Sequence, residues 1–316
     1  MRSPGSRRDR HTARSFLLAV YPWRKGQEMR ELLIICVVAG LSLMTATSAR
    51  ADIMVTGIAS PQDLVNEILG SGVTVSNVVY TGYLGASGLF TDGLSSGLQV
   101  DSGIVLTSGY ASNITGLNTS DAITGDLGLP GDADLQAQVP GYWTYDATVL
   151  EFDFESAGGD VYFNYLFGSD EYNEWTNTSF NDVFGFFLDG SNIALIPGTT
   201  TPVSVNNVNG GNPLGVDASH PEFYNNNDLS DGGPFFPFEY DGFTDGFTAT
   251  ALDLAPGTHH IKLAISDSGD PILDSGVFIQ TGTFSDDPTP VVPVPGAVLL
   301  GMLGLGAAGL RLRKSA

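Results

Sequence analysis

Residues 148–155, which read Thr-Val-Leu-Glu-Phe-Asp-Phe-Glu, decide the fold class of this chain. Apolar and acidic side chains alternate along them, so that the Leu and both Phe side chains fall on one face and the acids on the other. This alternation predicts a strand with one buried and one solvated face, as in an antiparallel sheet. The period of two resumes over residues 161–167 after the glycine pair at 158–159, and we therefore expect these two strands to form a hairpin.

The remaining strands are spaced regularly along the chain. One short helix is expected over 62–69, because Ser60 suits the N-cap, Pro61 suits the first helical position and Gly70 ends the pattern. The sequence thus predicts an all-β fold, an antiparallel, jelly-roll-like β-sandwich of about ten strands with one short N-terminal helix. The further strands, separated by Gly, Asn, Asp and Pro, are expected over 74–80, 103–108, 183–188, 192–196, 203–208, 247–254, 260–266 and 277–284.

Two stretches interrupt the strand pattern. Residues 209–246 are rich in Asn, Gly, Asp, Pro and aromatic residues, and residues 110–145 form a second loop-rich region. Loops of this length in compact domains are usually functional or disordered. The aromatic content of 209–246 favours an ordered loop that packs or binds.

The charge of the chain is distributed unequally. Of its 13 Lys and Arg, nine precede Asp52 and three follow Leu310, so that Lys262 alone faces the 32 Asp and Glu between them, a formal charge of −31. Such a field repels phosphates and anionic lipid surfaces, which excludes nucleic acid as a partner. The same field concentrates cations. Either bound Ca²⁺ or simple solvation of an acidic surface accounts for it.

The N-terminus carries an export signal. An apolar run over 32–44 and the small-x-small site Ala49-Arg50-Ala51 predict a secretory signal peptide over 1–51, with Met29 as an alternative start. The single cysteine, Cys36, lies inside this segment. The mature protein therefore has no disulfide and no thiol to act as nucleophile or metal ligand.

The C-terminus carries a second targeting feature. A Pro-rich spacer over 286–296 precedes an apolar and basic segment over 297–316. The apolar run 297–310 is shorter than the roughly 20 residues of a comfortable transmembrane helix, which favours a sorting signal. With Pro293-Val294-Pro295 in its spacer, the segment resembles the Val-Pro-x-Pro variant of the PEP-CTERM signals of bacterial exosortase substrates. The resemblance implies an exosortase-type processing enzyme as partner and membrane contact through 297–310 before processing; a plain tail anchor and a buried hairpin are the alternatives.

An ordered set of motifs runs through residues 100–285. Residues 102–109 read Ser-Gly-Ile-Val-Leu-Thr-Ser-Gly, 167–172 read Phe-Gly-Ser-Asp-Glu-Tyr, and 179–187 read Ser-Phe-Asn-Asp-Val-Phe-Gly-Phe-Phe. Together with 240–244 and 267–278, they resemble the choice-of-anchor L family of bacterial surface proteins. Members of that family share this domain and carry different C-terminal anchors, one of which is exosortase-like. The resemblance implies a secreted, β-rich surface domain and no established activity or ligand.

Acids gather at the expected strand ends. Calcium prefers six to eight hard oxygen ligands, often gathered from loops, so the acids are candidate ligands and Ca²⁺ is the expected cofactor. Their spacing is not that of an EF-hand, and the alternative for each Asp is a turn former that bonds its own backbone. The six candidates are Asp170 and Glu171 after one strand, Asp182 before the next, and Asp267, Asp270 and Asp274 between the last two strands.

Other chemistries have weaker sequence support. The chain has no Gly-x-Ser-x-Gly elbow, His-Glu-x-x-His helix or P-loop, and His259-His260 are expected to be structural, so we expect no enzyme. A glycoside hydrolase that pairs Glu171 with Glu151 or Glu174 is the alternative. Loop aromatics could stack on sugars or cover the core edge: Tyr142, Trp143, Tyr145, Tyr172, Trp175, Tyr224, Phe235 and Phe236.

These observations together predict a secreted bacterial surface protein. Its single β-sandwich domain is expected over 52–285, after the signal peptide and before the spacer. We expect export to the cell envelope, cell surface or extracellular matrix. The expected role is structural or adhesive, with Ca²⁺ stabilising the domain and extracellular polysaccharide as a partner.

Overall fold

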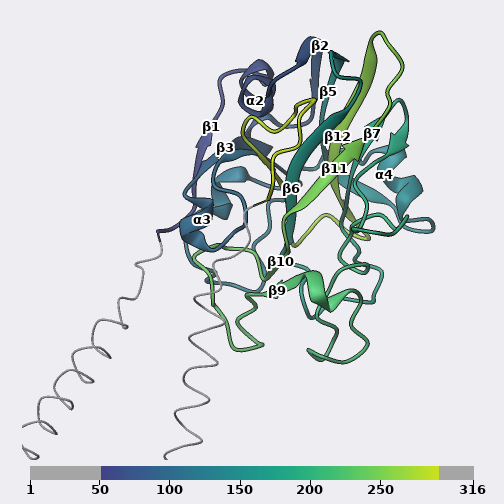
Figure 1. The fold of residues 1–316 in the computed structure, drawn as a ribbon. Helices are drawn as coiled ribbons and strands as arrows, with labels where there is room; N and C mark the ends of the chain where they lie inside the picture. Colours follow the sequence, from purple (N-terminus) through teal and green to yellow (C-terminus); the bar gives the residue numbers. More distant parts are fainter. Residues whose placement is uncertain (1–50, 292–316) are drawn as a thin grey trace, which may run out of the picture. The chain divides into compact units, whose positions relative to one another are not determined.

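Two antiparallel sheets face each other in the computed structural model, which describes residues 51–291 (Figure 1). The predicted all-β sandwich is confirmed. The larger sheet has the order β1 (Met54–Gly57), β3 (Ser87–Thr91), β4 (Gly103–Thr107), β13 (Ser275–Gln280), β6 (Val161–Ser169), β10 (Gly242–Thr244) and β9 (Tyr224–Asn226), and β11 (Phe247–Ala251) also pairs with β6. The smaller sheet has the order β2 (Val73–Thr81), β5 (Thr144–Ser156), β12 (His259–Ser268), β7 (Val183–Leu188) and β8 (Ser191–Asn192).

The main core lies between the sheets. Phe152 and Phe154 reach it from β5, whereas Phe163 and Tyr165 reach it from β6, and all four are at most 1% exposed. Their rings pack edge to face with other core aromatics, for example Phe163 with Phe186 at 4.8 Å between centroids. Such pairs add to the stabilisation that burial alone provides. The alternation along 148–155 is confirmed, because Glu151, Asp153 and Glu155 of β5 lie on the partly or fully exposed positions between the buried Leu150, Phe152 and Phe154.

The expected hairpin over 148–167 is wrong. β5 pairs with β2 and β12 in the smaller sheet, whereas β6 pairs with β13, β10 and β11 in the larger one. The glycines at 158–159 therefore connect the two sheets, and Gly159 takes a φ of 78°, which favours glycine. Both strands point their aromatic side chains at the same core from opposite sides. A hairpin and a connection between the two sheets therefore give the same alternation in the sequence, and the alternation could not distinguish them.

The outer face of the larger sheet is also covered. Leu166 of β6 and Phe278 of β13 are fully buried there, in a second core with Phe238, Tyr240 and Phe243 of the 209–246 region. Asn227 fixes this region, because its Nδ2 donates to the carbonyls of Phe238 and Tyr240 at 2.7 and 3.0 Å. The region is thus ordered and packs on the sheet, and it contains the short strands β9 and β10 that the pattern did not predict.

The sequence predicted one short helix, and the structure contains this helix and several further short ones. α2 (Pro61–Ile68) confirms the predicted helix, and the Asp63 carboxylate caps it by accepting from the backbone N–H of Ser60 at 2.8 Å. α4 (Ala133–Gln138) was not predicted and packs on the outer face of the smaller sheet. The structure also contains α3 (Gly93–Ser96), η1 (Leu84–Ala86), η2 (Ala111–Ile114) and η3 (Pro221–Phe223).

Two predicted strands are not formed as expected. Residues 203–208 form turns with one isolated bridge, between Ser204 and Val183. Of residues 192–196, only Asn192 lies in a strand, β8. Their apolar side chains are nevertheless buried in the main core, and this burial explains a strand-like pattern without strand pairing.

Within residues 51–291, none of the helices combines the length and the hydrophobicity that crossing a bilayer requires. The predicted signal peptide over 1–51, apart from its last residue, and the predicted sorting segment over 297–316 lie outside the described residues.

Candidate metal centre

One end of the sandwich collects the acids that the sequence singled out. β6 ends at Ser169, which pairs with Ser275 at the start of β13. On the other sheet, β12 ends at Ser268 beside the start of β7. Because the strands are antiparallel, these ends coincide. Five of the six predicted acids are buried there, and we call them the sandwich-end cluster: Asp170, Glu171, Asp182, Asp267 and Asp274.

Burial separates this cluster from ordinary surface acids. All five side chains are at most 2% exposed. The sixth candidate, Asp270, is partly exposed and accepts the backbone N–H of Ile272 through Oδ1 at 3.3 Å. That bond is the one expected of a turn former, so the turn reading fits Asp270.

Asp182 ties the two sheets together. Its Oδ1 accepts the backbone N–H of Ser268 at 2.9 Å, and its Oδ2 accepts the hydroxyl of Ser275 at 2.6 Å. Ser268 belongs to the smaller sheet and Ser275 to the larger. Despite these bonds, burial raises the pKa of Asp182 well above its ordinary value.

Asp170 and Asp267 are fully buried, yet neither has a hydrogen-bond partner on either carboxylate oxygen. Burial raises the pKa of both groups well above the ordinary range, and repulsion from neighbouring acids adds to this, above all from Asp241 on Asp170 and from Asp182 on Asp267. The Ser108 hydroxyl beside Asp267 offsets little, because it already bonds the backbone of Ser275. An unpaired buried carboxylate is among the most costly groups a protein can contain.

Burial also raises the pKa of two other members of the cluster, Glu171 and Asp274. Burial, followed by repulsion from Asp182, raises the pKa of Glu171 to about 10. Burial also raises the pKa of Asp274 to about 6, although its Oδ1 accepts the backbone N–H of Gly125 at 2.9 Å. The second oxygen of Asp274 has no partner.

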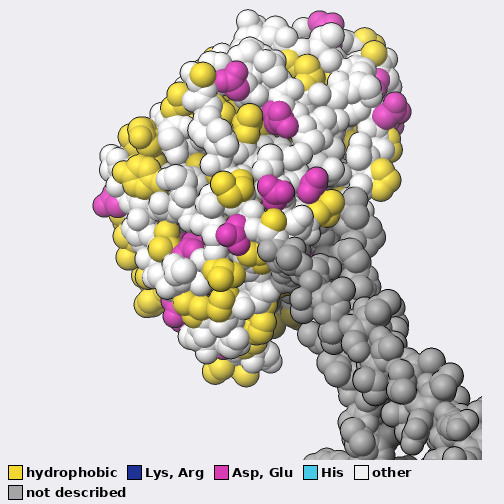
Figure 2. Space-filling view, turned by 90° about the vertical axis from the view of Figure 1, so that its left-hand side faces the viewer, with side chains coloured by type: hydrophobic (Ala, Val, Ile, Leu, Met, Phe, Trp, Pro, Cys, Tyr) yellow, Lys and Arg dark blue, Asp and Glu magenta, His cyan; other side chains and the backbone are white. Residues whose placement is uncertain are grey.

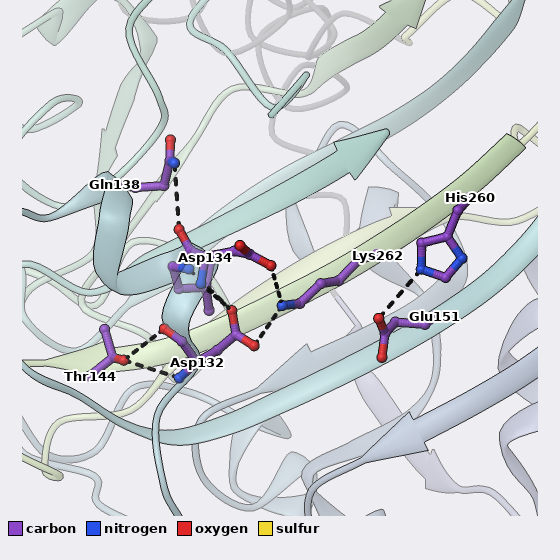
Figure 3. A network of polar contacts seen from close by, with 8 residues as sticks. Asp132, Asp134, Gln138, Thr144, Glu151, His260 and Lys262 are labelled. Carbon is purple, nitrogen blue, oxygen red and sulfur yellow. Dashed lines mark hydrogen bonds and ion pairs between the residues drawn. The ribbon is translucent and has the colours of Figure 1, made fainter. Parts of the chain in front are cut away.

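No protein cation compensates these acids within residues 51–291. Lys262 lies elsewhere, bonded to Asp132 and Asp134 at 2.6 and 2.7 Å (Figure 3). The ion pairs of His259 and His260 are with Asp189, Glu151 and Asp153. Among the residues that the structure describes, the face shown in Figure 2 displays acidic and hydrophobic side chains and no Lys or Arg.

A hard cation is the group that fits this arrangement. The buried side-chain polar atoms without a partner in the described part of the chain are all oxygens, mostly of carboxylates. Protonation is the other way to neutralise Asp170 and Asp267, and their raised pKa values favour it wherever no cation is bound. Calcium, in contrast, accepts six to eight oxygen ligands in flexible geometry and would leave the carboxylates ionised.

A second group of acids was missed by the sequence reading. Asp121, Glu174 and Asp228 bring one carboxylate oxygen each to within 4.8 Å of one another. Asp241 lies beside Asp228, because its carbonyl accepts the backbone N–H of Asn227 at 2.8 Å, and the charges of the three acids raise its pKa. We call these four residues the loop cluster. They lie 53, 54 and 13 positions apart along the chain, so no local motif could have joined them.

Of the two carboxylate pairs considered for glycoside hydrolysis, Glu171 and Glu151 belong to different sheets, whereas Glu171 and Glu174 are neighbours. Glu151 lies on β5 in the smaller sheet and bonds His260, whereas Glu171 follows β6 of the larger sheet. Glu174 is close enough to Glu171 to raise its pKa. The expectation that the chain is no enzyme stays a prediction.

The loop aromatics do not form one surface. Tyr172 is fully buried and donates its hydroxyl to the carbonyl of Val208 at 2.7 Å, so it belongs to the core. Trp143 is 70% exposed, and Phe235 is 50% exposed. A depression lined by residues of 113–124 and by Glu239 contains none of these aromatics.

Comparison with known proteins identifies the family of the domain. The Choice-of-anchor L domain family matches residues 54–285, which is nearly the whole of the described sandwich. Neither curated proteins nor solved structures contain a significant match to the chain. The motifs at 102–109, 167–172 and 179–187 fall inside the matched range and supply β4, the end of β6 and β7. The chain therefore belongs to the Choice-of-anchor L domain family, which indicates a bacterial surface protein.

Proposed function

We propose that this chain is an exported surface protein of the bacterial envelope with a structural or adhesive role, and that Ca²⁺ bound by the sandwich-end cluster stabilises its domain. Membership of the Choice-of-anchor L domain family supports the surface location. The signal-peptide pattern over 1–51 and the sorting-signal pattern over 286–316 support export and anchoring, with an exosortase-type enzyme as the processing partner.

The observation that carries the calcium proposal is the pair Asp170 and Asp267. Both are fully buried, and neither carboxylate has a hydrogen-bond partner on either oxygen. They lie where the two sheets end together, so a cation bound there would bridge the sheets as Asp182 does. In a chain without cysteine after residue 36, such a bridge would take the place of a disulfide.

A role in an extracellular matrix follows from the same features. The high negative charge favours solvation and repels anionic surfaces, so attachment to a matrix would use uncharged contacts or shared cations. Exposed loop aromatics such as Trp143 and Trp175 offer stacking surfaces for polysaccharide. A structural protein of this kind needs no catalytic site.

Thermal unfolding of residues 52–290 tests the calcium proposal. A ligand that binds only the folded state at 100 times its Kd stabilises by about 2.7 kcal/mol. For a domain of this size, that corresponds to a rise in Tm of about 5–10 °C. We expect this rise in millimolar Ca²⁺ relative to EDTA, beyond the effect of Na⁺ at matched ionic strength. Equal shifts in Ca²⁺ and in Na⁺ would mean that the acids are merely screened, and the calcium proposal would fail.

A further inference from the structure

The loop cluster joins three segments that are far apart in the sequence. Asp121 lies between η2 and α4, Glu174 lies in the connection from β6 to β7, and Asp228 lies in the connection from β9 to β10. Asp241 closes that same connection, one residue before β10. At this end of the sandwich, both loop-rich regions of the sequence therefore meet the loop that follows β6.

Asp241 gives the cluster a buried carboxyl oxygen without a hydrogen-bond partner. Its side chain is fully buried, Oδ1 accepts the amide of Asn118, and Oδ2 has no partner. Burial raises the pKa of Asp241 to about 9, and the charges that raise it further are those of Asp228, Asp121 and Glu174. The free oxygen of Asp241 thus belongs to a carboxyl group close enough to the other three for their charges to act on it.

The remaining ligand oxygens are held in place by the loops. Asp228 accepts the backbone N–H of Ser230 at 2.6 Å and that of Asn173 at 3.2 Å. Glu174 accepts the Ser230 hydroxyl through Oε1 at 2.9 Å, which leaves a buried Oε2 without a partner. Oδ1 of Asp121 and the amide oxygen of Asn173 are likewise buried and unpartnered.

This arrangement has the features of a metal site rather than of a hydrogen-bond network. Three acids converge with Asp241 beside them, and no Lys, Arg or His of residues 51–291 forms an ion pair with any of the four. The unsatisfied groups are carboxylate and amide oxygens, which are the ligands that Ca²⁺ uses. Without a cation, mutual repulsion would push the three loops apart.

We propose that the loop cluster is a second Ca²⁺ site, separate from the one in the sandwich-end cluster, and that its cation fastens the loops of residues 110–145 and 209–246 to the connection after β6. The sandwich-end cluster holds the sheets together, whereas this site holds the loops. The three segments that the cation would join also carry exposed aromatic side chains, among them Trp143, Trp175 and Phe235. None of the ligands of this second site belongs to the sandwich-end cluster, although the two clusters adjoin where the charge of Asp241 raises the pKa of Asp170.

Calorimetric titration of the domain with Ca²⁺ tests the proposal through Asp121→Asn. This substitution removes a ligand charge from a partly exposed residue and is therefore compatible with folding. We expect Asp121→Asn to bind one Ca²⁺ fewer than the wild type, or to bind it at least tenfold more weakly. Glu222→Gln removes an exposed charge from the same 209–246 region and should titrate like the wild type.

Hydrogen exchange supplies a readout specific to the loops. In Ca²⁺, Asp121→Asn should exchange at least tenfold faster than the wild type over 117–123 and 227–241, while β5 and β12 stay protected. Wild-type stoichiometry and loop protection in Asp121→Asn would overturn the proposal. It would also be overturned if Asp267→Asn, which alters only the sandwich-end cluster, removed all Ca²⁺ binding and loop protection, because the loop cluster would then hold no cation of its own. Loss of the loop site with retained Ca²⁺ stabilisation of the sheets leaves the proposed sandwich-end site intact.

Discussion

Two groups of acids in this domain carry charge in buried or partly buried positions, and they differ in whether a side chain of the protein neutralises that charge. On the outer face of the smaller sheet, Asp132 and Asp134 share the ammonium group of Lys262 (Figure 3). At the end of the sandwich, Asp170 and Asp267 are more deeply buried and have no cationic side chain beside them. The first group is neutralised by the protein itself, and the second is not.

The two regions also differ in how far water and backbone N–H groups solvate their acids. Lys262 and Asp132 are 12% and 16% exposed, so water still solvates part of the pair, and α4 covers the rest. Asp132 also caps α4 by accepting the backbone N–H of Asp134 and of Leu135. The sandwich-end cluster has neither solvent nor a helix terminus beside it. If the proposed Ca²⁺ binds there, the stability of this end depends on the cation, whereas the Lys262 region is neutralised by the protein's own ammonium group.

The largest expected effect in this comparison comes from Asp267→Asn. In Ca²⁺, this substitution should destabilise the domain by about 2.7 kcal/mol, because it removes the bound cation's contribution at 100 times its Kd. In EDTA, it should leave the domain as stable as the wild type or more stable, because it removes a buried, unpaired charge. Urea unfolding in both conditions measures the two differences.

The reversal between the two conditions separates ligand binding from packing. A substitution that only disturbed packing would destabilise by the same amount in Ca²⁺ and in EDTA. Glu155→Gln removes an exposed acid of the same sheet and should change stability little in either condition. If Asp267→Asn kept the full response to Ca²⁺, the sandwich-end cluster would not be the site.

The comparison also shows what the sequence could predict. The alternation along β5 and β6 predicted the strands and their buried faces, but not that the strands belong to different sheets, because alternation gives the face and not the pairing partner. Motifs near strand ends located five acids that do converge. The loop cluster could not be predicted, since the convergence of Asp121, Glu174 and Asp228 depends on how two long loops fold back on the sheet. α4 escaped prediction for its shortness, although Asp132 followed by Asp134 is a typical capping pattern.

A smaller effect is expected from Lys262→Met. Methionine keeps an apolar chain over the ring of Phe187, which lies 5.7 Å from the Lys262 ammonium, but removes the charge. Oδ2 of Asp132 then loses its partner in a mostly buried position, at a cost of about 1–2 kcal/mol. This loss should be equal in Ca²⁺ and in EDTA, because the region needs no added cation.

A matched variant sharpens this test. Asp134 is 60% exposed, so Asp134→Asn removes the weaker half of the same network and should cost less than about 1 kcal/mol. If Ca²⁺ rescued Lys262→Met, the region would bind a cation in place of the lysine. The distinction between the two regions would then be wrong.

The smallest expected effect concerns the histidines that open β12. Their acidic partners are Asp189 for His259, and Asp153 and Glu151 for His260, and the backbone N–H of His260 also donates to Asp189. The bond to Asp189 raises the pKa of His259 and the bond to Asp153 raises that of His260. A raised pKa in the folded state means that the protonated form is favoured by folding. The contribution is therefore fully present below the unfolded value of about 6.5 and disappears as pH rises through the folded pKa.

The double variant His259→Gln/His260→Gln should consequently be less stable than the wild type at acidic pH. The loss should be less than about 1 kcal/mol, because solvent screens each pair through an exposed partner, Asp189 at 52% and His260 at 48%. At pH well above the folded pKa, the difference should shrink to the loss of neutral hydrogen bonds. Urea unfolding in EDTA from about pH 5.5 to about pH 8.5 measures it, and the titration of the buried acids cancels because both proteins contain them. A difference that grew with rising pH would reverse the sign and show that these histidines fold in their neutral form. The smaller sheet would then lack the self-contained charge balance that distinguishes it from the sandwich end.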